Sequence, residues 1–155
     1  MSPRADATKR NNSNWYDDVA MPALLRGARG VYATALHTAL ADAGCDDMPR
    51  NGAFVVGAIA RNGSPLGEII DNLGLSKQRA GQLVDTLVAR GYLERAPDPN
   101  DRRRMTVSLT DRGRLAAATG RDAVERVDAA LAERVGAGAV ANLRATLGDL
   151  MESAG

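Results

Sequence analysis

Apolar residues recur at three- and four-residue steps along several stretches of the chain, which is the spacing of amphipathic helices. The first stretch starts at Pro22, a residue suited to a first helical position, and ends near residues 43–44. A second, shorter helix is expected from Arg50 to Arg61. Its Gly52 and Gly57 weaken intrinsic helicity and suggest close packing against a neighbour.

Two short helices joined by a glycine turn come next. Ser64 and Pro65 are a cap and a first-turn proline, and Gly74 suits a left-handed position just after the helix that they begin. Ser76 can cap the following helix, which is expected over about 77–90. This arrangement is typical of a helix-turn-helix. The apolar positions of the second helix, expected to face the core, are Ala80, Leu83, Val84, Leu87 and Val88.

A hairpin is predicted directly after Gly91, which ends the second helix. Residues 92–95 favour a short strand, and residues 105–109 alternate apolar and polar as a half-buried strand does. The segment between them, 98–104, is rich in turn formers and carries three consecutive arginines. A helix-turn-helix followed by a basic hairpin is a winged helix.

The C-terminal third predicts two more helices. Thr110 can cap a long helix over 111–135, the run Gly136-Ala137-Gly138 interrupts it, and a last helix carries leucines up to Met151. The fold class is therefore mainly α with a small β-hairpin wing: a winged helix-turn-helix domain plus N- and C-terminal helices. The apolar stripes of these helices exceed what a small winged domain can bury, so we expect them to form a helical dimerisation region. The expected divisions are a disordered arm (1–14), an N-terminal dimerisation helix (15–48), the DNA-binding domain (49–113) and C-terminal dimerisation helices (114–155).

Composition narrows the function only in part. The 155 residues are 45% hydrophobic and 3% aromatic, which argues against a base-stacking platform for single strands. Net charge is +1, but residues 61–114 hold ten Lys and Arg against seven Asp and Glu. The single cysteine, Cys45, excludes an intrachain disulfide and favours a reducing compartment. With no apolar run of membrane-spanning length and no signal-peptide pattern, we expect a soluble, cytoplasmic protein.

The hairpin and the second helix of the pair together resemble the MarR (multiple antibiotic resistance regulator) family of winged helix-turn-helix transcriptional regulators. The wing is similar to the family pattern D-P-x-D-R-R-x-x-x-V-x-L-T-x-x-G, and the helix frame matches in register. The residues that carry this likeness are Asp98-Pro99-Asn100-Asp101-Arg102-Arg103, Val107, Leu109-Thr110, Gly113, Leu73-Gly74-Leu75-Ser76, Leu83-Val84, Leu87 and Gly91-Tyr92-Leu93.

The resemblance implies a homodimer that binds an inverted-repeat site in double-stranded DNA, with the recognition helix in the major groove and the wing in the minor groove. It also implies a crevice for a small anionic or phenolic ligand, which the sequence does not identify. The chemistry of the side chains agrees, because arginine and glutamine can pair with guanine and adenine and arginine suits a narrow minor groove. The candidate DNA-binding residues are Ser76, Lys77, Gln78, Arg79 and Gln82 on the helix and Arg102, Arg103 and Arg104 on the wing, with Asp101 expected to orient Arg103 through a salt bridge.

Other classes of function remain open at this point. A repressor that a small ligand releases is the family default, and a winged-helix protein-interaction module without DNA binding or a thiol-based redox sensor using Cys45 are the alternatives. The carboxylates beside Cys45 disfavour a thiolate. No enzyme is expected, since the chain has no glycine-rich phosphate loop or organised nucleophile, and Cys45 with His37 has no zinc-ligand spacing. No cofactor or metal is expected.

Overall fold

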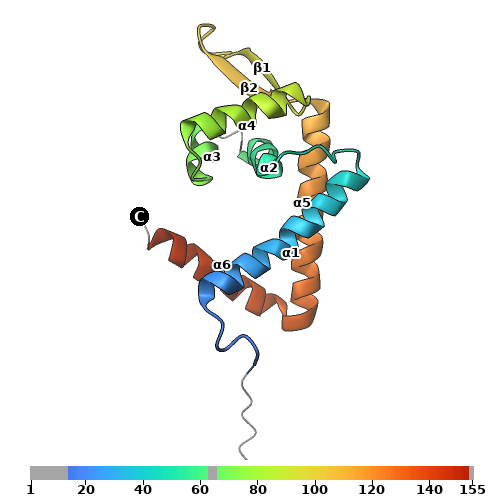
Figure 1. Cartoon of the computed structure of the whole chain (residues 1–155), viewed down its shortest axis with the longest axis vertical. Helices are drawn as coiled ribbons and strands as arrows, with labels where there is room; N and C mark the ends of the chain where they lie inside the picture. Colours follow the sequence, from blue (N-terminus) through green and yellow to red (C-terminus); the bar gives the residue numbers. More distant parts are fainter. Residues whose placement is uncertain (1–13, 63–65, 154–155) are drawn as a thin grey trace, which may run out of the picture. The chain divides into compact units, whose positions relative to one another are not determined.

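The computed structural model describes residues 14–62 and 66–153, which fall into two compact units divided after Val31. Figure 1 shows the element order, in which a hairpin follows four helices and precedes two. Apart from Asn14, the predicted N-terminal arm lies outside the described residues, as do Ser64 and Pro65. The elements are α1 (Met21–Asp42), α2 (Gly52–Asn62), α3 (Leu66–Asn72), α4 (Lys77–Ala89), β1 (Leu93–Pro97), β2 (Met105–Leu109), α5 (Asp111–Val135) and α6 (Ala137–Glu152).

The predicted helix-turn-helix is confirmed in α3 and α4. Gly74 has φ +62, so it occupies the left-handed region that the turn requires. The Ser76 side chain then caps α4 by accepting a hydrogen bond from the Arg79 backbone N–H at 3.3 Å. Gly91, at φ +74, ends the helix where the sequence predicted.

The wing is an antiparallel hairpin whose register pairs Leu93 with Leu109 and Pro97 with Met105. Strand β2 matches its predicted bounds, whereas β1 begins one residue later and ends two residues later than expected. In Figure 1 the hairpin lies beside α4 and projects beyond it. The two elements that carry the candidate residues are therefore neighbours in one compact unit.

A small apolar core holds α2, α4, the hairpin and α5 together. Tyr92 is the largest side chain that is fully buried, and Leu87 and Leu93 are buried beside it. The predicted core face of α4 is confirmed, with four of its residues buried and Val88 packed against the cluster. Gly52 shows the expected close packing, since an added Cβ would lie 2.7 Å from Met48 Sδ. At Gly57 that expectation is wrong, because an added Cβ would meet nothing within 4 Å.

The last two helices leave much apolar surface uncovered. Gly136, at φ +89, separates α5 from α6. The predicted interruption between the two helices is therefore one residue long, because Ala137 and Gly138 already belong to α6. Asp128 of α5 accepts a hydrogen bond from the Tyr32 hydroxyl at 2.5 Å and pairs with Arg144 of α6. No residue of α6 is buried within the chain. None of the described helices is long and apolar enough to cross a membrane.

Candidate nucleic-acid interface

The polar face of α4 presents all five predicted recognition residues to solvent. Ser76, Lys77, Gln78, Arg79 and Gln82 are exposed, while the opposite face of the same helix is buried in the core. This division follows from the helical repeat, which separates the buried Ala80, Leu83, Val84 and Leu87 from the polar positions. Ser76 has two uses, because its oxygen caps the helix while its hydroxyl hydrogen is still available to a ligand.

The wing tip is organised by two aspartates and displays three arginines. Asp98 Oδ1 accepts the Asn100 backbone N–H at 2.7 Å, and Asp101 Oδ1 accepts the Arg103 backbone N–H at 3.0 Å. Such side-chain-to-backbone bonds two residues apart are Asx turns, which aspartate forms readily. The backbone also closes on itself, with the Asp98 N–H donating to the Arg104 carbonyl at 2.8 Å. The aspartates therefore shape the loop from which the arginines project.

Arg102, Arg103 and Arg104 are all exposed. Within residues 66–153, as described, their guanidinium groups form no ion pair and no hydrogen bond with the protein. The predicted orienting role of Asp101 has a different local geometry here, because its carboxylate holds the backbone of Arg103 and not the guanidinium. A salt bridge between these two side chains stays a prediction.

One ion pair joins the wing to the recognition helix. Arg95 Nη2 of β1 lies 2.5 Å from Asp85 Oδ1 of α4, and both side chains are exposed. Asp85 is the acidic residue on the otherwise neutral or basic exposed face of α4, so the pair offsets a charge that would repel phosphates. The sequence alone gives no partner for Asp85, because Arg95 lies on a different element.

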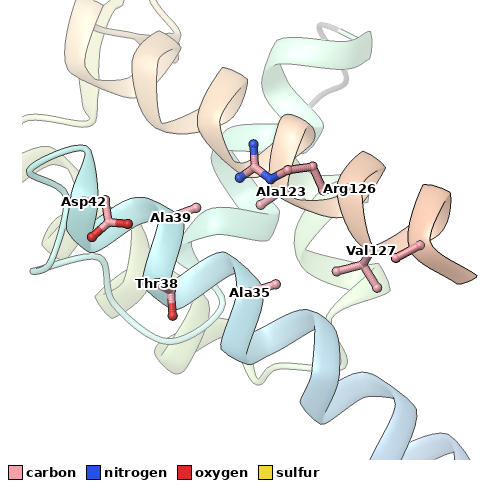
Figure 2. A pocket seen from close by; sticks show the side chains of 8 residues that line it. Ala35, Thr38, Ala39, Asp42, Ala123, Arg126 and Val127 are labelled. Carbon is pink, nitrogen blue, oxygen red and sulfur yellow. The ribbon is translucent and has the colours of Figure 1, made fainter.

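A shallow groove of about 420 Å³ runs between the second half of α1 and the middle of α5. Figure 2 shows small side chains along it, with Asp42 on the α1 side and Arg126 on the α5 side. The one cation and the one carboxylate offset each other, so the lining has no net charge to select an anion. The other lining residues are Ala35, Thr38, Ala39, Ala123, Val127 and Ala130.

Comparison with known proteins agrees with this geometry. Residues 46–104 match the model of the MarR family. The structure of MepR from S. aureus in complex with DNA aligns with a TM-score of 0.69 at 16% identity, covering 92% of this chain and 100% of that one. Reduced MarR from E. coli aligns with a TM-score of 0.65 at 22% identity, covering 85% of this chain and 96% of that one. RV1404 from Mycobacterium tuberculosis aligns with a TM-score of 0.64 at 23% identity, covering 92% of this chain and 97% of that one. No curated protein matches the chain.

Residues 46–104 thus match the MarR family model, and the chain has the fold of the MarR and MepR structures. The structure also gives a physical reason for two positions of the wing motif, Thr110 and Gly113. The Thr110 hydroxyl donates to the Gly91 carbonyl at 2.5 Å and accepts the Gly113 backbone N–H at 3.0 Å, which caps α5 and ties it to the start of the wing. An added Cβ at Gly113 would lie 2.1 Å from the Tyr92 carbonyl oxygen, so only glycine fits this approach.

Sequence reasoning missed a polar cluster at the base of this MarR-type wing. Asp47, in the loop between α1 and α2, accepts hydrogen bonds from the Tyr92 hydroxyl and from Arg112 of α5. The Tyr92 hydrogen bond and then the nearby guanidinium lower the pKa of Asp47. Burial, followed by the bond to Asp47, raises the pKa of Tyr92 well above its usual range, and the same carboxylate raises the pKa of Arg112.

One signal in the sequence could have pointed to Arg112. Helix N-termini favour acidic residues, and a cation in the first turn opposes the helix dipole unless something else compensates it. Arg112 is the second residue of α5 and is compensated by Asp47, at 2.9 Å.

Cys45 and His37, the candidates for redox or metal chemistry, belong neither to α4 nor to the wing. Cys45 is 1% exposed, so the free thiol is shielded from oxidants, and His37 is exposed on α1. In the residues that the structure describes, no group of three or more His, Cys, Asp or Glu side chains is placed to hold a metal ion.

Proposed function

We propose that this protein is a homodimeric transcriptional regulator that binds a specific double-stranded DNA site, and that it represses until a small ligand releases it. The observation that carries the proposal is the pairing of two cationic, exposed elements in one compact unit. The polar face of α4 and the arginine tip at 102–104 offer base-edge and minor-groove chemistry side by side. The DNA complex of MepR, which has the same fold, supports this use of the elements.

The fold and the free cations support DNA binding, whereas repression and ligand release are supported by the family resemblance alone. The groove beside Arg126 has no net charge to favour an anionic effector. A cytoplasmic location is part of the same proposal, because the proposed target is double-stranded DNA.

Selection of bound fragments from random duplexes tests the proposal. A two-fold dimer presents its recognition helices about one DNA turn apart, so the selected site should be an inverted repeat of roughly 16–20 base pairs. Footprinting on that site should protect both halves equally. A short asymmetric footprint, or no enrichment above background, would contradict the proposal.

Dimerisation is expected from the apolar surface of α6. This helix has no residue buried within the chain, and Leu143 and Leu150 are 47% and 52% exposed, seven positions apart on one face. Surface of this kind is covered across a two-fold axis in symmetric dimers. Light scattering at micromolar concentration should therefore return twice the chain mass of 16.3 kDa.

The variant Leu143→Glu with Leu150→Glu should dissociate this dimer, since charged side chains would enter the interface. Glu152→Gln, a charge change at an exposed position at the end of α6, is the control and should leave the mass unchanged. A wild-type mass of one chain would overturn the homodimer.

A further inference from the structure

Asp47 receives hydrogen bonds from three residues that flank or belong to the DNA-binding elements. Its Oδ1 accepts the Tyr92 hydroxyl, and its two carboxylate oxygens accept the Arg112 guanidinium at 2.9 Å and 3.3 Å. Its backbone carbonyl accepts the Arg90 guanidinium. One loop residue is thus bonded to the C-cap of α4, to the residue before β1, and to the first turn of α5.

Arg112 closes the cluster from the other side. Its guanidinium lies over the Tyr92 ring, 4.3 Å from the centroid, and donates to the Arg90 carbonyl at 2.5 Å and to the Gly44 carbonyl at 3.1 Å. A planar fork that stacks on a ring and donates in several directions is a geometry available to arginine and not to lysine.

The cluster sits where the two DNA-binding elements separate. Helix α4 ends at Ala89 and β1 begins at Leu93, so the direction of the recognition helix and the direction of the wing are both set within the residues 90–92. Arg90 and Tyr92 are bonded to Asp47 or Arg112. A carboxylate does not attract phosphates, and both oxygens of Asp47 already accept hydrogen bonds from protein groups, so we expect Asp47 to contribute to DNA binding through the position of other groups.

We propose that Asp47 and Arg112 are positioning residues for DNA binding, which fix the recognition helix and the wing relative to each other through Arg90 and Tyr92. This inference rests on the proposed function. Neither residue is assigned a contact with DNA.

The substitution Asp47→Asn distinguishes a positioning role from a charge effect, because the two predict opposite changes in DNA affinity. Removing a negative charge from a DNA-binding surface would tighten binding if charge alone mattered. Loss of the positioning contacts should instead weaken binding of the selected operator, roughly 3- to 30-fold, on the scale of residues that act without touching the ligand. Asp46→Asn is the matched control, because it makes the same charge change at the neighbouring position. Asp46 is exposed, and its side chain has no hydrogen bond in the described structure. It should bind as wild type or slightly tighter.

Arg112→Gln and the double variant test whether the two residues act as one unit. Arg112→Gln should weaken binding as Asp47→Asn does while the salt slope keeps its wild-type value. A slope lowered by about one would mean that Arg112 contacts a phosphate directly, which would overturn its positioning role. The double variant should bind no more weakly than the weaker single variant, because both changes break one network.

A loss of folded protein is separated from a loss of positioning by stoichiometric titration. Titration at high operator concentration gives the active fraction of each variant, and dissociation constants are then compared for that fraction only. Should Asp47→Asn not fold, Tyr92→Phe carries the test, since it keeps the buried ring and removes only the hydroxyl donor. It should weaken binding in the same direction, and a wild-type dissociation constant would overturn the inference. If the wild type binds operator and Asp47→Asn binds it as Asp46→Asn does, the positioning role is refuted and the proposed function is not. If the wild type binds no duplex, the proposed function itself is refuted.

Discussion

Replacing Arg103 with alanine is expected to weaken operator binding by about 1–3 kcal/mol per half-site, on the scale of one good specific interaction with a base. Arg103 projects from a tip whose backbone is held by Asp101, and its guanidinium has no partner in the described structure. A narrow minor groove concentrates negative potential and attracts such a side chain. The weakening should therefore be largest on operators with A·T-rich flanks, which would lose most of their advantage over G·C-rich flanks.

Arg104 provides the matched control for this prediction. Arg104 is the next residue and is also exposed, but we assign its side chain to phosphates. Arg104→Ala should weaken both kinds of operator alike and lower the salt slope by about one for each phosphate that the side chain no longer reaches. Titrations of wild type and both variants on A·T- and G·C-flanked operators at several salt concentrations make the comparison. If the two variants show the same flank preference, Arg103 does not read the minor groove.

Asp101→Ala should show a weaker form of the Arg103 defect. The carboxylate accepts the Arg103 backbone N–H, so its removal loosens the tip without deleting the guanidinium. The same titrations measure this variant. A defect spread evenly over both flanks would assign Asp101 to loop folding alone.

Among the substitutions proposed for this protein, Gly113→Ala is expected to lower the free energy of unfolding most. A Cβ there would lie 2.1 Å from the Tyr92 carbonyl oxygen and 3.1 Å from Leu109 Cδ2. The first of these atoms is backbone and cannot rotate away, so α5 or the start of the wing must shift. We expect a destabilisation on the order of 3 kcal/mol, at the upper end for overpacked sites, together with weaker DNA binding.

Gly57→Ala is the control for Gly113→Ala. Gly57 also lies in a helix, and its added Cβ would meet nothing within 4 Å. Alanine there should be neutral or stabilise by up to about 1 kcal/mol through helix propensity. Urea unfolding at one fixed protein concentration measures both, because dimerisation would make stability depend on concentration. Equal midpoints for Gly113→Ala and wild type would contradict the close approach of α5 to Tyr92.

Features set by neighbouring residues could be predicted from the sequence. The caps at Ser76 and Thr110, the left-handed turn at Gly74 and the buried face of α4 each depend on residues within a few positions of one another. The same holds for β2, whose alternation is local. These features placed the candidate DNA-binding residues on the exposed helix face and the wing tip.

Features set by distant partners could not be predicted in this way. Strand β1 extends to Pro97 because Pro97 pairs with Met105 across the hairpin, which no local propensity encodes. Asp47 and Arg112 are 65 positions apart, and Asp85 finds Arg95 only once the wing folds beside α4. The sequence shows these residues as ordinary surface charges. Their partners emerge only from the packing of the helices and the hairpin.

The salt dependence of duplex binding tests the central claim most directly. A labelled operator duplex and an unrelated duplex of equal length would be titrated with wild-type protein between about 50 and 200 mM salt. A DNA-binding regulator should prefer the operator, and its affinity should fall about a thousandfold or more over this range if six or more phosphates are contacted. A protein-interaction module with the same winged helix would bind neither duplex, or would bind with an affinity that salt does not change. Either result would contradict the account.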